Sequence, residues 1–256
     1  MEQQIQFLNL SGEKLAGTFH VPAKNSRHGI ILGHCFTCSR HTRILRDVSL
    51  ALVDVGFKVL RFDFSGNGQS EGNFAESFYS KQVKDLEAAA SFISSQGVTW
   101  IGLAGHSMGA MVALLAASQM DTIQAVCTLA AKASSLQSFH FLSQNQVQEL
   151  QRSGRVNFVS RGRTLELTEA FIADAAKYDL PSTMPSLAQP LMVVHGDMDE
   201  ITPVENAYQL HRYRSVNTEL VIIPGADHMF SQDEHRQEVA QRVAQWFKDL
   251  ASKEGF

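Results

Sequence analysis

The chain has few cysteines. Only Cys35, Cys38 and Cys127 occur in 256 residues, and an odd, low count excludes the disulfide framework of a small secreted domain. We therefore expect a reducing compartment, the cytoplasm. Cys35 and Cys38 form a C-x-x-C flanked by His34 and His41, which leaves a redox pair or half of a metal site as an alternative. No second spaced pair completes a zinc set, so we favour unpaired loop cysteines and no metal.

Positive charge and long apolar runs are also scarce. A net charge of −4 and a pI near 6.2 provide no basic surface for nucleic acid. The amino terminus lacks the basic and apolar segments of a signal peptide. The longest uncharged stretch, residues 101–120, contains Gly, Ser, His and Gln, so we interpret it as a buried strand and helix and not as a membrane span.

Apolar strand patterns alternate with helical ones along most of the chain. After an antiparallel hairpin, this alternation predicts an α/β fold with a mostly parallel eight-stranded sheet and helices on both faces. The predicted strands cover residues 5–8, 15–21, 28–34, 58–64, 99–104, 125–130, 191–195 and 219–223, and the predicted helices cover 40–55, 80–94, 110–117, 204–213 and 236–250.

Residues 132–189 interrupt this alternation. The stretch is too long for an ordinary crossover and predicts an inserted cap, with a hairpin around residues 161–162 and a helix over 169–178. Its aromatic residues, among them Phe139 and Phe158, either form the core of the cap or line the underside of a lid. We find no linker or repeat, so the prediction is a single domain over residues 1–256.

Residues 105–109 form the pattern G-x-S-x-G between a predicted strand and a predicted helix. A serine on such a sharp turn is a candidate nucleophile, and Gly105 and Gly109 leave room for the chains to pass. The backbone N–H of Met108 lies at the positive end of the helix, where it can bind an oxyanion. The pentapeptide alone also occurs in ordinary loops, so the assignment of Ser107 depends on its partners.

A serine nucleophile needs a histidine base that is oriented by a carboxylate. Candidate residues of both kinds come directly after later predicted strands. Asp197 and Asp199 come directly after one predicted apolar strand, and His228 comes after the last one. Sites in such folds collect at this carboxyl edge of the sheet. The chain order of Ser107, acid and histidine is the order expected with a strand-to-helix nucleophile turn.

With these motifs in order, the sequence resembles the α/β-hydrolase superfamily, and within it the small, lid-bearing esterases and serine acyl-hydrolases. Its N-terminal loop is similar to that of hydrolase modules fused to OsmC-like domains. The motifs that carry the resemblance are residues 34–37, 61–70, 105–109, 195–203 and 225–230.

The resemblance implies a role for each candidate residue. It places the acid at Asp199, four residues before the proline of its loop, with Asp197 as the competitor, and the base at His228. It places the second oxyanion donor at the backbone N–H of Phe36. The chain departs from many relatives at Cys35, where they have a glycine that tolerates backbone angles a cysteine avoids.

The remaining motifs predict structural roles. The glycines of residues 66–72 fit neither a dinucleotide-binding nor a P-loop pattern, so we expect no cofactor. His106 is expected to pack under the turn of Ser107, and the other histidines are interpreted as surface or rim residues.

The expected function is hydrolysis of a small-molecule substrate, a small to medium acyl or aryl ester. A peptidase or thioesterase with the same triad stays open, as does a ligand-sensing receptor that retains the triad. No nucleic-acid or membrane partner is expected. A homodimer is among the assemblies that the sequence allows.

Overall fold

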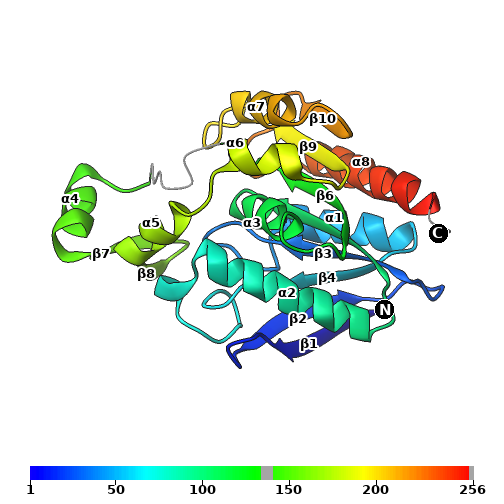
Figure 1. Cartoon of the computed structure of the whole chain (residues 1–256), viewed down its shortest axis with the longest axis horizontal. Helices are drawn as coiled ribbons and strands as arrows, with labels where there is room; N and C mark the ends of the chain where they lie inside the picture. The colour runs from blue at the N-terminus through cyan, green and yellow to red at the C-terminus, as the bar shows by residue number, and fades with distance from the viewer. Residues whose placement is uncertain (134–140, 254–256) are drawn as a thin grey trace.

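The computed structural model describes residues 1–133 and 141–253. It contains one eight-stranded sheet with the order β1-β2-β4-β3-β5-β6-β9-β10 and a separate hairpin, β7-β8 (Figure 1). The strands are β1 (Glu2–Leu8), β2 (Lys14–His20), β3 (His28–Gly33), β4 (Lys58–Phe62), β5 (Trp100–His106), β6 (Ile123–Leu129), β7 (Arg155–Ser160), β8 (Arg163–Thr168), β9 (Leu191–Gly196) and β10 (Thr218–Ile223).

Strands β3, β4, β5, β6, β9 and β10 run parallel, and β1 and β2 add an antiparallel edge next to β4. Every residue of β3, β4, β5 and β9 is buried, which explains why apolar residues occupy consecutive positions in these strands and do not strictly alternate with polar ones. The polar exceptions, such as Lys58 and Arg61 of β4, are buried as well. The predicted fold class, a mostly parallel eight-stranded sheet with a leading hairpin, is confirmed.

Helices cover both faces of the sheet. Helices α1 and α8 pack on one face, and α2, α3 and α7 pack on the other (Figure 1). The main helices are α1 (Arg43–Asp54), α2 (Tyr79–Ser95), α3 (Met108–Ala117), α7 (Glu205–Tyr213) and α8 (Asp233–Ser252). The core accordingly has two apolar layers, one with Phe57 and Phe247 and the other with Leu86 and Leu103. This arrangement fixes the carboxyl ends of the parallel strands as one rigid edge.

The segment between β6 and β9, where we expect an inserted cap over residues 132–189, carries several short elements, and part of it extends beyond the sheet beside α2 (Figure 1). It contains β7, β8, α4 (Gln144–Ser153), α5 (Glu169–Ala175), α6 (Leu180–Thr183) and the short 3-10 helix η2 (Met184–Ser186). A further 3-10 helix, η1 (Phe74–Glu76), precedes α2.

The insertion is tied to the sheet domain by side chains. Asp174 of α5 accepts hydrogen bonds from the backbone N–H of Ser80 at 2.9 Å and from its Oγ at 2.5 Å. The Thr168 hydroxyl donates to the carbonyl of Ala75 at 3.2 Å. These contacts hold α5 against the start of α2 and β8 against η1.

The interpretation of Cys35 and Cys38 as unpaired residues is wrong, because a disulfide joins them. The backbone N–H of Cys38 donates to the carbonyl of Cys35 at 3.1 Å, and this tight turn brings the two Cα atoms to 5.2 Å. That separation lies within the range that a disulfide requires. Cys127 is buried in β6 as a free cysteine.

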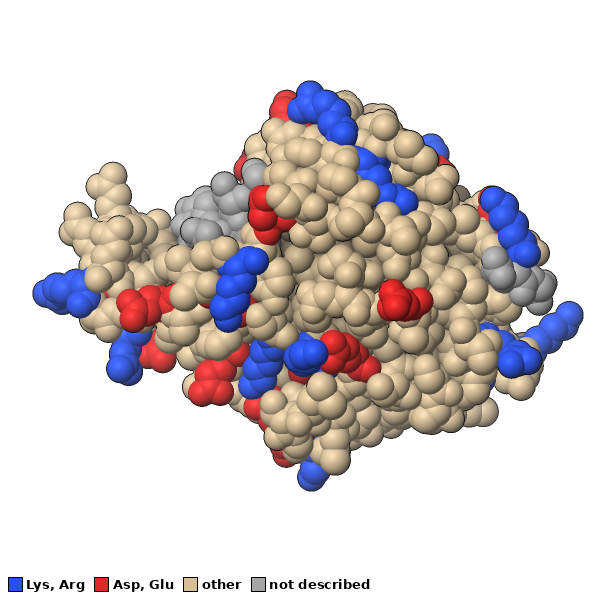
Figure 2. All heavy atoms as spheres, in the orientation of Figure 1, with Lys and Arg blue, Asp and Glu red and all other residues tan. Residues whose placement is uncertain are grey.

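Charged residues of both signs are interspersed on the face shown in Figure 2. The acidic and basic side chains are scattered among uncharged residues there, without an extended patch of one sign on this face. Among the described helices, none combines the length and apolar character needed to cross a bilayer.

Candidate active site

Ser107 lies on a strained turn between β5 and α3. Its backbone has φ 55° and ψ −116°, a conformation that non-glycine residues rarely adopt. A Cβ at Gly105 would lie 2.2 Å from the carbonyl oxygen of Gly109, and one at Gly109 would lie 2.4 Å from that of Gly33. The expected need for glycine at both positions is therefore confirmed. Met108, directly after the serine, is the first residue of α3.

Ser107, His228 and Asp199 form a continuous hydrogen-bonded chain. His228 Nε2 lies 3.0 Å from Ser107 Oγ, and His228 Nδ1 lies 2.8 Å from Asp199 Oδ2. Asp199 follows β9 and His228 follows β10, which is adjacent in the sheet. The other acid, Asp197, instead accepts a hydrogen bond from the backbone N–H of Gly225 at 2.6 Å. The geometry brings Asp199, and not Asp197, to the imidazole.

Asp199 is held as a carboxylate. Burial by itself would raise its pKa, but hydrogen bonds from His195 and His228 and from the backbone of Thr202 lower the pKa well below the ordinary value. Its Oδ1 accepts the N–H groups of Ile201 at 2.9 Å and Thr202 at 2.7 Å. With both oxygens bonded, the carboxylate stays charged and fixed in orientation.

Two further histidines contact the hydrogen-bonded series of Ser107, His228 and Asp199. His106 is fully buried, as predicted, and its Nε2 lies 2.8 Å from the carbonyl oxygen of His228. Burial is the main reason that its pKa is lowered to about 3, so the ring is neutral. His195 is also fully buried, and its Nε2 lies 2.7 Å from the Thr202 carbonyl and 3.2 Å from Asp199 Oδ2.

The interpretation of the other histidines as surface or rim residues is therefore wrong for His195. It is wrong for His20, His28 and His34 as well, which are buried. His195 lies in β9, whose residues are all buried, because both faces of the sheet are covered. A signal for its role was present in the sequence, since it ends an apolar run four residues before Asp199.

Phe36 lies in the loop after β3, next to the insertion. Cys35 is not among the described residues with positive φ, so the backbone there is one that a cysteine adopts without strain. The Phe36 ring stacks on Phe158 of β7 at a centroid distance of 6.1 Å and contacts Phe171 of α5 at 5.4 Å and Phe141 at 5.7 Å. The aromatic residues of the insertion thus pack on the loop of Phe36. Phe139 lies outside the described residues.

Polar contacts join the same two segments. The hydroxyls of Thr37 and Ser160 lie 2.8 Å apart, and Arg163 donates to the carbonyl of Thr37 at 3.1 Å. The loop of Phe36 is therefore held by the β7-β8 hairpin through both apolar and polar contacts.

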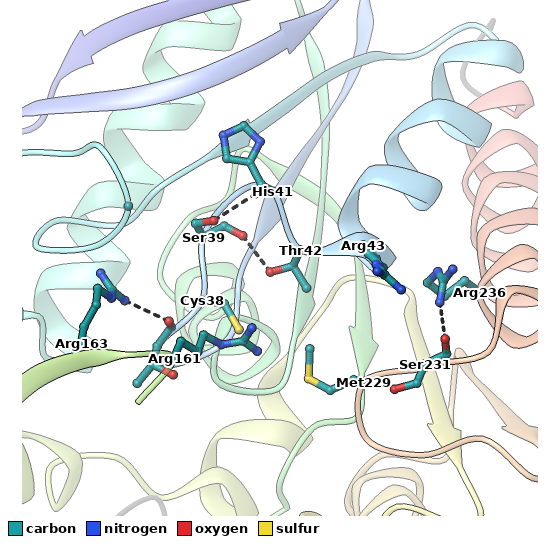
Figure 3. Close-up of a pocket in the computed structure, with 12 residues that line it drawn as sticks. Cys38, Ser39, His41, Thr42, Arg43, Arg161, Arg163, Met229, Ser231 and Arg236 are labelled. Carbon is teal, nitrogen blue, oxygen red and sulfur yellow. Dashed lines mark hydrogen bonds between the residues drawn. The ribbon is translucent and has the colours of Figure 1, made fainter. Parts of the chain in front are cut away.

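A pocket of about 570 Å³ opens beside this loop. Figure 3 shows residues from three parts of the chain around it, including Cys38, Arg43, Arg161, Met229 and Arg236. They come from the loop after β3 and the start of α1, from the turn of the β7-β8 hairpin, and from the segment after His228 together with the first turn of α8.

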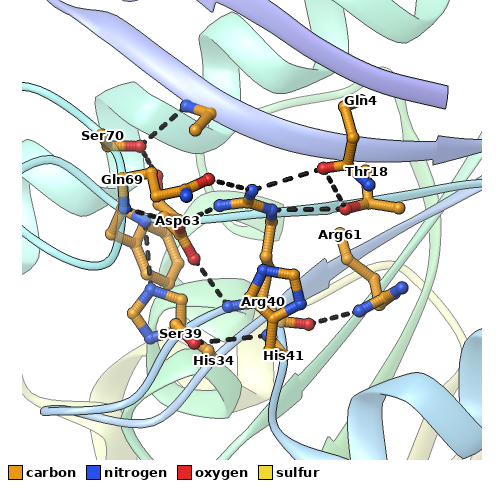
Figure 4. A network of polar contacts seen from close by, with 12 residues as sticks. Gln4, Thr18, His34, Ser39, Arg40, His41, Arg61, Asp63, Gln69 and Ser70 are labelled. Atoms are coloured by element: carbon orange, nitrogen blue, oxygen red, sulfur yellow. Dashed lines mark hydrogen bonds and ion pairs between the residues drawn. The ribbon is translucent and has the colours of Figure 1, made fainter.

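A buried ion pair of Arg40 with Asp63 fixes the other end of the loop (Figure 4). Asp63 also accepts the backbone N–H of Arg40 at 2.6 Å and that of Gln69 at 2.9 Å. Arg40 donates further to Gln69 Oε1 at 2.6 Å and to Thr18 Oγ1 at 3.2 Å. The network ties the loop after β3 to β2 and to the loop after β4.

The same network explains the glycine-rich loop of residues 66–72. A Cβ at Gly68 would lie 2.1 Å from a carboxylate oxygen of Asp63, so the loop closes over this acid. The loop has a structural role here. Among the described residues, no three His, Cys, Asp or Glu side chains are arranged to hold a metal ion.

The sequence of this chain matches the model of a known protein family. Residues 46–254 match the model of the prolyl oligopeptidase family. The mitochondrial palmitoyl-protein thioesterase ABHD10 of Rattus norvegicus is 27% identical over 180 residues, which are 68% of this chain and 60% of the rat protein. The match thus spans less than two thirds of the length of that relative.

Solved structures are similar over nearly the whole chain. Est1E from Butyrivibrio proteoclasticus, solved with ferulic acid bound, is 25% identical, with a TM-score of 0.82 over 97% of this chain and 100% of that one. The esterase domain of a Rhodothermus marinus protein is 25% identical, with a TM-score of 0.76 over 97% and 98%. Mouse ABHD10 has the same fold, with 22% identity and a TM-score of 0.78 over 97% and 99%.

Proposed function

Because the chain belongs to the prolyl oligopeptidase family, within the α/β-hydrolase superfamily, we propose that it is a serine hydrolase of small to medium acyl or aryl esters. One observation carries the proposal. Ser107 Oγ, on a strained turn, lies 3.0 Å from His228 Nε2, whose other ring nitrogen lies 2.8 Å from the charged Asp199. Nucleophile, base and orienting acid are then in hydrogen-bond contact, as acyl transfer requires.

In the proposed reaction, His228 Nε2 accepts the Ser107 proton while Ser107 Oγ attacks the ester carbonyl. The backbone N–H groups of Phe36 and Met108 hold the oxyanion, and Asp199 fixes the imidazole. The imidazolium donates its proton to the departing alcohol, which leaves an acyl-enzyme. Water then attacks the acyl group as His228 accepts its proton. The bond between Ser107 Oγ and the acyl carbon breaks, His228 returns the proton to Ser107 Oγ, and the acid is released.

The ester preference is supported by the similarity to Est1E and to the Rhodothermus marinus esterase domain. The residues around Phe36 agree with it, because the aromatic rings of Phe141, Phe158 and Phe171 provide an apolar surface beside the proposed oxyanion donor. The insertion supplies these rings, so we assign it the role of a cap.

The proposal is tested with 4-nitrophenyl esters of increasing acyl length. We expect Ser107→Ala and Asp199→Asn each to lower kcat by a factor of about ten thousand, because the members of a triad act as a unit. Asp197→Asn is the matched control, since it removes the same charge two residues away from Asp199 and should stay within about threefold of the wild type. Full activity of Ser107→Ala, or equal losses in the two Asp variants, would contradict the assignment.

Thioester hydrolysis is the second candidate, because the rat relative is a palmitoyl-protein thioesterase. The same triad serves both bonds, so only relative rates separate them. A panel of matched oxygen esters, thioesters and aminoacyl amides decides between the candidates by kcat/KM. A thioester value well above that of the matched ester would replace the first candidate by the second, and a higher amide value would replace both.

A further inference from the structure

The pocket beside the loop of Phe36 has an unusual charge composition. Four arginines line it, Arg43, Arg161, Arg163 and Arg236, and no acidic residue is among the described residues that do so. The chain as a whole has more acidic than basic residues, 26 against 22. This arginine pocket is therefore a local concentration of positive charge in an acidic protein.

The four arginines differ in how they are paired. Arg236 forms ion pairs with Asp47 and Asp233, and Arg163 donates to a backbone carbonyl. Arg43 and Arg161 are exposed, and neither forms an ion pair within the described part of the chain. Two guanidinium groups from different elements are thus available to a ligand.

The backbone around Arg161 supports a binding role. The turn between β7 and β8 consists of Arg161 and Gly162, with φ 51° and 73°. Asn, Asp or Gly is the usual first residue of such a turn, because a positive φ is unfavourable for a long side chain. The turn carries Arg161 toward the space between Cys38 and Met229 (Figure 3).

The pocket adjoins the proposed site at two points. Thr37, which follows the proposed oxyanion donor, and Met229, which follows His228, both line it. Burial is the main cause of the lowered pKa of His106, and the positive charge of Arg161 adds to it, so this charge acts on the ring next to Ser107. The pocket therefore borders the two segments that carry the proposed oxyanion donor and His228.

We infer that the arginine pocket binds an oxyanion group of the substrate, a carboxylate or a phosphate, with Arg161 and Arg43 as its main contacts. This inference rests on the proposed function and adds the class of substrate. A guanidinium group offers paired N–H donors that match the two oxygens of a carboxylate or phosphate. The family comparison assigns no such preference to this chain.

The test compares charged and neutral substrates that share the same scissile group. For the carboxylate, the pair is mono-4-nitrophenyl adipate and its methyl ester. For the phosphate, it is acetyl-coenzyme A and S-acetyl-N-acetylcysteamine. We expect kcat/KM to favour at least one charged member by about tenfold, and this preference to fall in Arg161→Gln, in Arg43→Gln and at high salt. The pair that shows the preference identifies the anion.

Arg152→Gln is the matched control, because Arg152 is an exposed arginine in the last turn of α4 that does not line the pocket. Arg152→Gln changes the net charge by the same amount as Arg161→Gln and Arg43→Gln, and it should keep the wild-type preference for the charged substrate. Equal kcat/KM for both members of both pairs, or the same loss of preference in all three variants, would overturn the inference.

The failure of this inference is distinguishable from the failure of the proposed function. Labelling of Ser107 by a fluorophosphonate and turnover of the neutral esters report on the triad alone. Calorimetric titration with adipate reports on the pocket alone, and its binding should weaken in the Arg161→Gln, Arg43→Gln double variant. An enzyme that turns over neutral esters but neither prefers nor binds the anions retains the proposed function and lacks the inferred site.

Discussion

At the scale of single residues, the carboxylate of Asp199 depends on a residue outside the proposed triad. His195 Nε2 lies 3.2 Å from Asp199 Oδ2 and 2.7 Å from the carbonyl of Thr202, whose N–H also bonds Asp199. His195 therefore braces both the acid and the turn that holds it. We describe it as a positioning residue, because it acts on the reacting atoms only through Asp199.

His195→Gln is expected to lower kcat about tenfold with little change in KM, since a hydrogen bond to a charged group is weakened. The same change in an Asp199→Asn background should have almost no further effect, because both act through one carboxylate. His211→Gln, on the last turn of α7, is the control and should match the wild type. Additive losses in the double variant would show that His195 has only a general structural role.

At the scale of elements, the loop after β3 is held at both ends. The β7-β8 hairpin contacts Phe36 and Thr37, and the buried pair of Arg40 with Asp63 anchors the segment before α1. Because Phe36 lies between the cysteines of a disulfide, its backbone has little freedom. This preorganisation is what a backbone oxyanion donor needs, since it must not rearrange during the reaction.

Asp63→Asn is expected to lower the free energy of unfolding by about 3–5 kcal/mol, because it leaves the Arg40 guanidinium buried without a counter-charge. Glu238→Gln is the matched control, since it breaks an exposed pair with Arg242 on α8 and should cost at most about 1 kcal/mol. Urea denaturation monitored by circular dichroism measures both. Equal effects would mean that the buried network does not stabilise the loop.

At the scale of the whole molecule, the fold buries several histidines in neutral form. Burial is the main cause that lowers the pKa of His20, His34 and His106, the last of them to about 3. In the unfolded chain these rings titrate near 6.5. Below that pH the unfolded state binds protons that the folded state does not, so acid favours unfolding.

The free energy of unfolding should therefore fall as the pH decreases from about 6.5 toward 3. His106→Gln removes one of these groups, so the slope of stability against pH in this window should decrease by up to about 1.4 kcal/mol per pH unit. Urea titrations at pH 7, 6, 5 and 4 measure the slope, and the absolute stability of the variant does not enter the comparison. An unchanged slope would mean that His106 binds protons equally in the folded and unfolded states over this pH range.

Local patterns in the sequence were sufficient to predict the sheet, its leading hairpin and, within the insertion, the β7-β8 hairpin and α5, whereas α4, α6 and η2 were not predicted. Apolar periodicity and turn residues act over a few positions, so they can be read without knowledge of distant contacts. The positions of Ser107, Asp199 and His228 after their strands followed from the same patterns together with the family resemblance, and their roles remain predictions.

The sequence by itself determined the fold class and the edge of the sheet where the candidate residues collect. Only the tertiary structure decided that Asp199 and not Asp197 faces His228, that His195 is buried beneath it, and that arginines from α1, α8 and the hairpin turn share one pocket. These contacts join side chains on different strands and loops. They are set by the packing of the elements against each other, which no local pattern specifies.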